Sequence, residues 1–366
     1  MKLTNIETYI VSVPLKKPFK TALRTVTEAE SVIVKLTAGK EIGWGEAPPT
    51  VVITGECTAS IESAIRNVIK PKLLGLDLTA YESVFQQLHR LLVRNTSAKA
   101  AVDMALYDLL AKKSQLPLYK YLGGYQNGFE TDYTVSVNDP KEMGHDAVEY
   151  IEDGFTILKV KVGKDSIHQD IQRIKEIRNR IGDRALIRID ANQGWKPKEA
   201  ISAIREMEDA GLDIELVEQP VLAHDLEGLK RVTEAVQTPI MADESVFSPQ
   251  DALKVIQLRA ADLINIKLMK AGGIHQALKI NALAESAGME CMVGSMIESR
   301  VGITAAAHLA ASQPNITRYD FDAPLMLKED LVSGGVVYDR NKMSFTEDFG
   351  LGINEVKRGG VTIGNN

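Results

Sequence analysis

The chain has 366 residues, of which 45% are hydrophobic and 25% are charged, a composition typical of a globular protein with a sizeable core and not of a disordered or fibrous chain. Its 49 acidic residues outnumber its 43 Lys and Arg residues, giving a net charge of −6 without a basic block. This balance argues against a nucleic-acid or anionic-membrane surface and leaves a small molecule as the expected partner.

The N-terminus is interrupted by polar residues and prolines, and no apolar run reaches the ~20 residues that cross a bilayer, so we expect a cytoplasmic protein. Cys57 and Cys291 have no ligand-like spacing, and we expect both to be buried as small hydrophobic residues.

The first part of the chain, residues 1–124, is predicted to form an α+β domain. Strand-like runs at 5–15 and 30–47 are joined by a polar segment, and helical patterns extend from about Ser60 to Lys120. We expect the polar segment to form a loop, centred on about 18–28.

From about residue 125 the pattern is a β-rich run followed by an amphipathic helix, repeated along the chain. One helix carries Ile at helical spacing between Ile167 and Ile181, and another is predicted to begin with Ser248 as N-cap and Pro249 in its first turn. The last polar residues of the β runs recur at nearly even intervals: Thr134, Lys161, Asp190, Glu218, Asp243, Lys267, Ser295 and Asp320. Eight such units favour a TIM-like (β/α)8 barrel, with its active site at the carboxyl ends of the strands.

Three consecutive strand ends are acidic: Asp190, Glu218 and Asp243. Neighbouring strands lie about 4.8 Å apart, so three carboxylates this close would repel one another unless a cation neutralised them. Oxygen ligands without a neighbouring His or Cys favour Mg²⁺, with Mn²⁺ as a possible substitute. The six histidines fall in predicted helices or loops, and none is expected to bind the metal.

Lysines occupy the second and sixth strand ends, on either side of these acids. Lys159 and Lys161 share one strand face, because alternate residues of a strand point the same way. An exposed strand with solvated lysines is the alternative, but both faces of a closed parallel barrel are covered, except at the mouth. Lys161 and Lys267 are therefore predicted to reach the site, since Lys is almost never fully buried without a partner.

Taken together, these motifs closely resemble the enolase superfamily, muconate-lactonizing subgroup, over essentially the whole chain. They are "KVK" at 159–161, "DANQGW" at 190–195, "EQP" at 218–220, "ADES" at 242–245 and "NIKLMKAGG" at 265–273. "GWGEAPP" at 43–49 and the segment 97–124 also resemble the N-terminal capping domain of that family. The resemblance implies a modified (β/α)7β barrel over 125–325 and a C-terminal segment, 326–366, that returns to the capping domain.

The resemblance also implies a reaction: Mg²⁺-dependent 1,1-proton transfer through an ene-diolate, with Lys161 and Lys267 as acid/bases on opposite faces. Lys159 would contact the substrate carboxylate. Desolvation and cationic neighbours would have to keep the lysine base neutral. The enzyme would be an isomerase.

The pair Asp320 and Asp322 in "RYDFDAPL" resembles the DxD of the dipeptide epimerases, where it holds the α-ammonium group of the dipeptide; an acid-capped helix start is the alternative. Arg24 matches the position that clamps a glutamate side chain in the alanyl-glutamate epimerases, although it could also be a solvated loop cation. Further residues expected to line the dipeptide pocket are Thr134, Ser295, Ile297 and Glu298.

The resemblance therefore implies an epimerase of L-Ala-D/L-Glu dipeptides, active in murein peptide metabolism and, by family precedent, a homo-oligomer. N-acylamino acid racemase and o-succinylbenzoate synthase use the same two lysines and are the enzymatic alternatives, but the DxD pair argues against both. A non-catalytic, enolase-like binding protein is the remaining alternative; it would be expected to have lost a metal ligand or a base.

Overall fold

The computed structural model describes residues 1–358 and begins with a three-stranded antiparallel sheet. Strands β1 (Asn5–Lys20), β2 (Thr25–Ala38) and β3 (Glu41–Ala47) follow one another in space as in sequence. The polar segment expected to be a loop lies mostly within the long β1–β2 hairpin, whose pairing continues to Lys20 and Thr25 after a register shift. Antiparallel pairing satisfies backbone N–H and C=O groups whatever the side chains are, so polarity alone did not reveal these strand ends.

The helices that follow this sheet include a long one that packs against β2 and β3. They are α1 (Thr58–Ser63), the π-helix η1 (Ala64–Ile69), α2 (Lys70–Leu73), the 3₁₀ turn η2 (Leu78–Ala80), α3 (Tyr81–Arg90), α4 (Thr96–Lys113) and α5 (Leu118–Tyr121). Glycines let β3 lie directly on the buried α4, because a Cβ at Gly45 would stand 1.8 Å from the carbonyl oxygen of Ala101. Cys57, which precedes α1, is exposed, so its predicted burial is wrong; Cys291 is buried as expected.

The second part of the chain is an eight-stranded parallel sheet whose strands are neighbours in sequence order. They are β5 (Tyr133–Val135), β6 (Ile157–Lys161), β7 (Leu186–Asp190), β8 (Ile214–Glu218), β9 (Ile240–Ala242), β10 (Leu263–Lys267), β11 (Cys291–Gly294) and β12 (Ile316–Tyr319). The first and last strands meet through hydrogen bonds rather than a regular ladder, from Asp132 N to Tyr319 O (3.4 Å) and from Phe321 N to Thr131 Oγ1 (2.8 Å).

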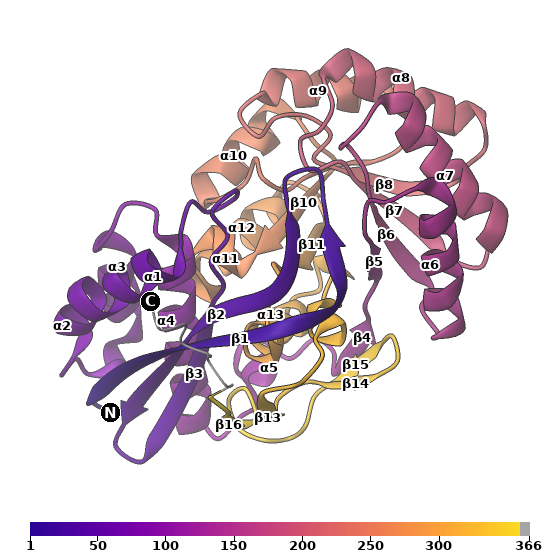
Figure 1. Ribbon diagram of the computed structural model, residues 1–366. Helices are drawn as coiled ribbons and strands as arrows, with labels where there is room; N and C mark the ends of the chain where they lie inside the picture. Colours follow the sequence, from indigo (N-terminus) through magenta and orange to yellow (C-terminus); the bar gives the residue numbers. More distant parts are fainter. Residues whose placement is uncertain (359–366) are drawn as a thin grey trace, which may run out of the picture.

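Helices cover the outside of this barrel, as Figure 1 shows. They are α6 (Pro140–Glu152), α7 (Ile167–Ile181), α8 (Pro197–Asp209), α9 (Leu226–Ala235), α10 (Pro249–Leu258), α11 (Leu268–Ala271), α12 (Ile274–Ser286) and α13 (Arg300–Ser312). Within residues 1–358, the 3₁₀ turn η3 (Ala323–Met326) is the only helical segment after β12, so the last unit lacks a long helix and the fold is of the (β/α)7β type. The predicted cap of α10 is confirmed, since Ser248 accepts a hydrogen bond from the N–H of Asp251 and Pro249 opens the helix.

The remaining short strands form two further small sheets. Strands β14 (Val337–Asp339) and β15 (Lys342–Ser344) form a sheet with β4 (Gly128–Glu130), and β13 (Val332–Gly334) pairs with β16 (Ile353–Val356). The predicted C-terminal segment touches the N-terminal region where Tyr9 Oη donates to Val356 O (3.0 Å) and Leu118 N donates to Gly350 O (2.7 Å). Its last residues, 359–366, lie outside the described part of the chain.

Carboxylates of the N-terminal region cap two barrel helices. Asp103 Oδ1 accepts from Ile274 N (2.6 Å) at the start of α12, and the Glu46 carboxylate accepts from Ser299 N and Gly302 N (both 2.8 Å) at the start of α13. Both carboxylates are fully buried. These bonds fix the N-terminal region against the helices that follow β10 and β11.

Across residues 1–358, no helix combines the length and the apolar character required to traverse a lipid bilayer.

Candidate active site

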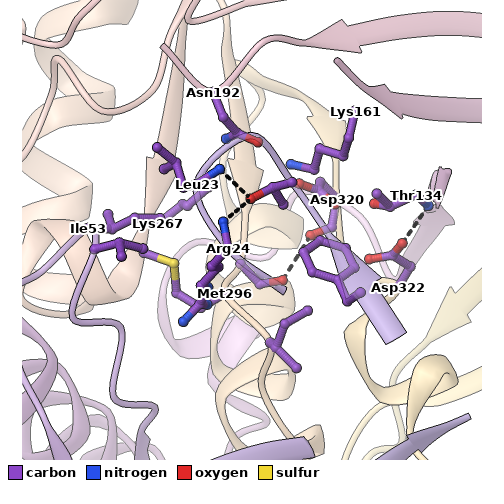
Figure 2. Close-up of a pocket in the computed structure, with 15 residues that line it drawn as sticks. Leu23, Arg24, Ile53, Thr134, Lys161, Asn192, Lys267, Met296, Asp320 and Asp322 are labelled. Atoms are coloured by element: carbon purple, nitrogen blue, oxygen red, sulfur yellow. Dashed lines mark hydrogen bonds between the residues drawn. The ribbon is translucent and has the colours of Figure 1, made fainter. Parts of the chain in front are cut away.

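A cavity lies between the tip of the β1–β2 hairpin and the mouth of the barrel, and Figure 2 shows the side chains that line it. Its lining combines the hairpin, the segment after β3 and the strand ends of the barrel: Phe19, Thr21, Leu23, Arg24, Val52, Ile53, Thr134, Lys161, Asn192, Lys267, Ser295, Met296, Ile297, Asp320 and Asp322. Two segments far apart in sequence therefore form one site.

The three carboxylates that are predicted to bind a metal lie at the carboxyl ends of three neighbouring barrel strands. Asp190 and Glu218 end β7 and β8 and are register partners, and Asp243 follows the last residue of β9. All three are 0% exposed. Within residues 1–358 they do not close around one point as a set of metal ligands, because each is turned to a lysine.

The chemistry of these residues nevertheless fits a hard divalent cation. Three buried carboxylates are strong anionic oxygen donors, and Glu218 Oε2 and Asp243 Oδ1 accept no hydrogen bond in the described residues, although each lies near a lysine ammonium. Burial raises the pKa of Glu218 to about 7, and the neighbouring Asp190 charge adds to the effect. Burial and the Asp190 charge therefore favour the protonated form of Glu218.

Lys161 and Lys267 enter the cavity from β6 and β10, which are the second and sixth strands and so lie on opposite sides of the barrel (Figure 2). Lys161 Nζ lies 2.6 Å from Asp190 Oδ2, and Lys267 Nζ lies 2.8 Å from Asp243 Oδ2. Burial lowers the pKa of Lys267, but the charges of Asp243, Glu218 and Asp190 together outweigh it and hold the pKa above its usual value. In this arrangement the ion pair favours the protonated form of Lys267.

Arg24 stands on the opposite wall, in the turn of the hairpin (Figure 2). Burial lowers the pKa of its guanidinium, and among residues 1–358 no carboxylate lies within ion-pair distance of it. The turn is held locally, by Thr21 N donating to Arg24 O (3.0 Å) and by the N–H groups of Leu23 and Arg24 donating to Thr21 Oγ1 (3.1 and 3.3 Å).

The acid pair lies on the barrel wall, just beyond β12. Asp320 Oδ2 accepts from Lys159 Nζ (2.7 Å), and Asp322 Oδ2 accepts from the N–H of Thr134 (2.6 Å). Burial raises the pKa of Asp320, but the charges of the three site lysines outweigh it and lower the pKa overall. Burial and the Asp320 charge raise the pKa of Asp322 to about 7.

Two predicted substrate residues do not line the cavity. Lys159 is 1% exposed and is enclosed by Asp320, Glu218 (2.8 Å) and Asp190 (3.4 Å), because these acids attract its ammonium group inward. Glu298 is 2% exposed and accepts from the N–H of Met296 (2.8 Å), since the chain turns sharply between Gly294 and the start of α13. The predicted Thr134, Ser295 and Ile297 do line the cavity.

Several lining residues were not predicted. Asn192 follows Asp190 by two residues, and its position in "DANQGW" was a usable signal. Phe19 lies 5.9 Å from Lys161 Nζ, measured to the ring centre, and Ile53 belongs to the segment after β3. Neither carried a signal in the sequence, because a single apolar residue in a polar segment does not reveal what it covers.

Two family models together match most of the chain. Residues 5–123 match the family described as mandelate racemase / muconate lactonizing enzyme, N-terminal domain, and residues 142–357 match the enolase C-terminal domain-like family. The chain is 63% identical over 354 residues to the L-Ala-D/L-Glu epimerase of Bacillus subtilis, covering 96% of this chain and 97% of the relative. The solved structure of that epimerase as a substrate-liganded complex has a TM-score of 0.97 at 62% identity, covering 98% and 100% of the two chains.

Two further relatives show the range of activities. The dipeptide epimerase of Enterococcus faecalis, solved in complex with Mg and the dipeptide L-Leu-L-Tyr, has a TM-score of 0.94 at 46% identity, covering 97% of this chain and 100% of that one. The N-succinyl-L-Arg/Lys racemase of Bacillus cereus is 35% identical, covering 96% of this chain and 95% of the relative. The chain therefore belongs to the mandelate racemase and muconate lactonizing enzyme family of the enolase superfamily.

Proposed function

We propose that this protein is an L-Ala-D/L-Glu epimerase, which inverts the α-carbon of the C-terminal residue of an alanyl-glutamate dipeptide. The observation that carries the proposal is the charge pattern of one cavity, in which an unpaired guanidinium and a pair of aspartates lie on different walls. High identity over nearly the whole chain to an L-Ala-D/L-Glu epimerase supports the same activity.

Two charged groups of the dipeptide have complementary partners in the cavity. Arg24 presents a planar fork of N–H donors that matches a carboxylate, so we assign it to the glutamate side chain. Asp320 and Asp322 would accept hydrogen bonds from the α-ammonium group of alanine. An N-acylated substrate has no ammonium group to place beside these two buried acids, which disfavours an N-acylamino acid racemase or an o-succinylbenzoate synthase.

Asp190, Glu218 and Asp243 would hold the divalent cation. When bound, Mg²⁺ supplies positive charge that stabilises the second negative charge developing on the substrate carboxylate as the α-proton leaves. The ion pairs that Lys161 and Lys267 make with these acids would then be weakened, and Lys267 would lose the interaction that favours its protonated form. A neutral lysine could accept the α-proton, as a general base must.

Inversion follows from the placement of Lys161 and Lys267 on opposite sides of the barrel. One lysine removes the α-proton from its face, the α-carbon becomes planar, and the other lysine delivers a proton to the opposite face. The C–H bond that breaks and the one that forms balance, so the reaction needs no oxidant or reductant. Solvent exchange afterwards restores the two lysines to their starting protonation states.

The test is incubation of the protein with Mg²⁺ and a panel of dipeptides in D₂O, followed by proton NMR of the α-position. L-Ala-L-Glu and L-Ala-D-Glu should interconvert with incorporation of one deuterium at the glutamate α-carbon, and N-acetyl-L-Ala-L-Glu should react much more slowly. Faster exchange of N-acylated substrates than of free dipeptides would contradict the proposal.

Three finer points belong to the same proposal. We expect Mn²⁺ to replace Mg²⁺, because both accept carboxylate oxygens. We also expect a homo-oligomer and a cytoplasmic location. Light scattering after size-exclusion chromatography, activity with MnCl₂ and cell fractionation test these points separately.

A further inference from the structure

Lys270 is a fully buried lysine that plays no part in the proton transfer described above. It lies in α11, the single turn after β10, three residues beyond Lys267, and is 0% exposed. A buried ammonium group must be paired and hydrogen-bonded to avoid a large desolvation cost. What it binds therefore indicates what it does.

The ammonium group of Lys270 binds backbone carbonyls from two neighbouring elements. It donates to the carbonyl oxygens of Asp243, Val246 (3.1 Å) and Asn265 (3.0 Å), which satisfies its three N–H donors. Two of these carbonyls belong to the segment between β9 and α10, and the third belongs to β10. The lysine thus ties the segment 243–246 to β10.

The same ammonium group also lies 2.7 Å from Asp243 Oδ1. The other oxygen, Oδ2, faces Lys267 at 2.8 Å. The Asp243 N–H is occupied as well, donating to Gln219 Oε1 (2.9 Å). The carbonyl and the N–H of Asp243 are therefore hydrogen-bonded to buried groups. Each of its carboxylate oxygens lies in an ion pair, although Oδ1 accepts no hydrogen bond among residues 1–358, and Lys270 supplies two of these four contacts.

Asp243 needs this support more than the other two acids do. Asp190 and Glu218 are the last residues of five-residue strands and are held in register by ladder pairing. Strand β9 has only three residues, its pairing with β10 ends at Ala242, and Asp243 lies beyond it. A carboxylate on an unpaired residue keeps a fixed direction only if other groups hold it.

We propose that Lys270 is a positioning residue that fixes the backbone and one carboxylate oxygen of Asp243, so that the other oxygen is directed into the site. Its ammonium group holds Asp243 where the ladder pairing between β9 and β10 has already ended. The inference rests on the proposed function insofar as Asp243 is a metal ligand, but not on which dipeptide is the substrate.

The test compares Lys270→Met, which keeps the length and removes the ammonium, with Lys254→Met, an exposed lysine on the neighbouring α10. Mg²⁺ affinity is measured by calorimetry, and hydrogen exchange of the 243–247 amides is followed in the metal-free protein. Lys270→Met should weaken Mg²⁺ binding about 10- to 100-fold, the range for residues that support a metal ligand. Exchange at 243–247 should accelerate, kcat should fall more than KM rises, and Lys254→Met should match the parent.

If Lys270→Met does not fold, Lys270→Gln, which keeps two N–H donors for the carbonyls, is judged by the same criteria. Unchanged Mg²⁺ affinity and kcat together with a lower melting temperature would overturn the proposal, because Lys270 would then serve only stability. Mg²⁺ affinity and hydrogen exchange do not involve substrate, so a parent protein that binds Mg²⁺ but epimerises no dipeptide would refute the proposed function without touching this inference.

Discussion

The two walls of the cavity are built on different principles. On the barrel wall, the acids and lysines stand at the ends of parallel strands, are at most 6% exposed and are linked by ion pairs. On the hairpin wall, Arg24 lies in a partly exposed turn whose own hydrogen bonds run to the neighbouring Thr21. The two walls therefore have different roles. The barrel wall holds the groups that need a fixed geometry, whereas the hairpin wall contacts the side chain of the substrate and can change in sequence without disturbing the barrel wall.

The largest expected effect is on the barrel wall, at the two lysines. Lys161→Ala and Lys267→Ala should each lose epimerisation by at least ~10² to 10⁴, the usual contribution of a general acid or base. If each lysine serves one face, each variant should still exchange the α-proton of one epimer with D₂O without inverting it, and the two variants should prefer opposite epimers.

Chiral chromatography and NMR of the same samples measure inversion and exchange separately. Lys164→Ala, an exposed lysine just beyond β6, is the matched control. Interconversion of the two epimers by either single variant at a rate near that of the parent would show that one base suffices, and Lys267 would then be an electrostatic partner.

The next effect concerns the acids on the same wall. Asn in place of Asp190 or Asp243, or Gln in place of Glu218, should weaken Mg²⁺ binding at least ~10-fold and reduce turnover accordingly, because each change removes a ligand charge. Calorimetry with Mg²⁺ is the measurement, and Asp209→Asn, an exposed acid at the end of α8, is the control. Full activity of the parent after EDTA treatment and gel filtration is incompatible with this role.

A change on the hairpin wall should be smaller and selective. Arg24→Ala should lower kcat/KM for L-Ala-L-Glu by about 10- to 100-fold, since a hydrogen bond to a charged group contributes about 1.5–3 kcal/mol. The loss should be much less for L-Ala-L-Gln, which has no side-chain carboxylate. Equal losses on the two dipeptides would mean that Arg24 only shapes the turn, and the distinction between the walls would fail.

The smallest effect is a pH dependence of substrate binding at Asp322. Its pKa of about 7 is raised by burial and by Asp320, so it gains a proton as the pH falls through neutrality and loses its attraction for an ammonium group. KM for L-Ala-L-Glu should therefore rise about fivefold between pH 7 and pH 6, a range in which the dipeptide amine, with a pKa of about 7.7–8.0, stays mostly protonated. The charged and titratable groups around Asp322 are Asp132, Tyr133, Tyr150, Lys159, Asp320 and Tyr338. Asp322→Asn should remove most of this dependence of KM on pH. If the variant keeps the dependence, another of these groups causes it.

The sequence predicted the barrel wall better than the hairpin wall, for physical reasons. Strand periodicity and an eight-fold repeat place Lys161 and Asp190 at strand ends, because alternation fixes which side a residue faces. No comparable rule describes a turn, so the length of the hairpin and the position of Phe19 were not predictable. The direction of Glu298 depends on how the chain turns after β11, and the burial of Lys270 depends on carbonyls from another strand.

The capping of α12 and α13 by Asp103 and Glu46 has a consequence for how the chain is assembled. A helix whose N-terminal N–H groups lack acceptors typically loses about 1 kcal/mol per cap, so a barrel synthesised without residues 1–124 would leave the first turns of both helices incomplete. During translation the N-terminal region is synthesised before α12 and α13, the two helices that it caps. Replacing residues 1–124 by the same region of a relative should therefore preserve the fold only where the incoming region has acids at the positions of both Asp103 and Glu46, in addition to the hairpin.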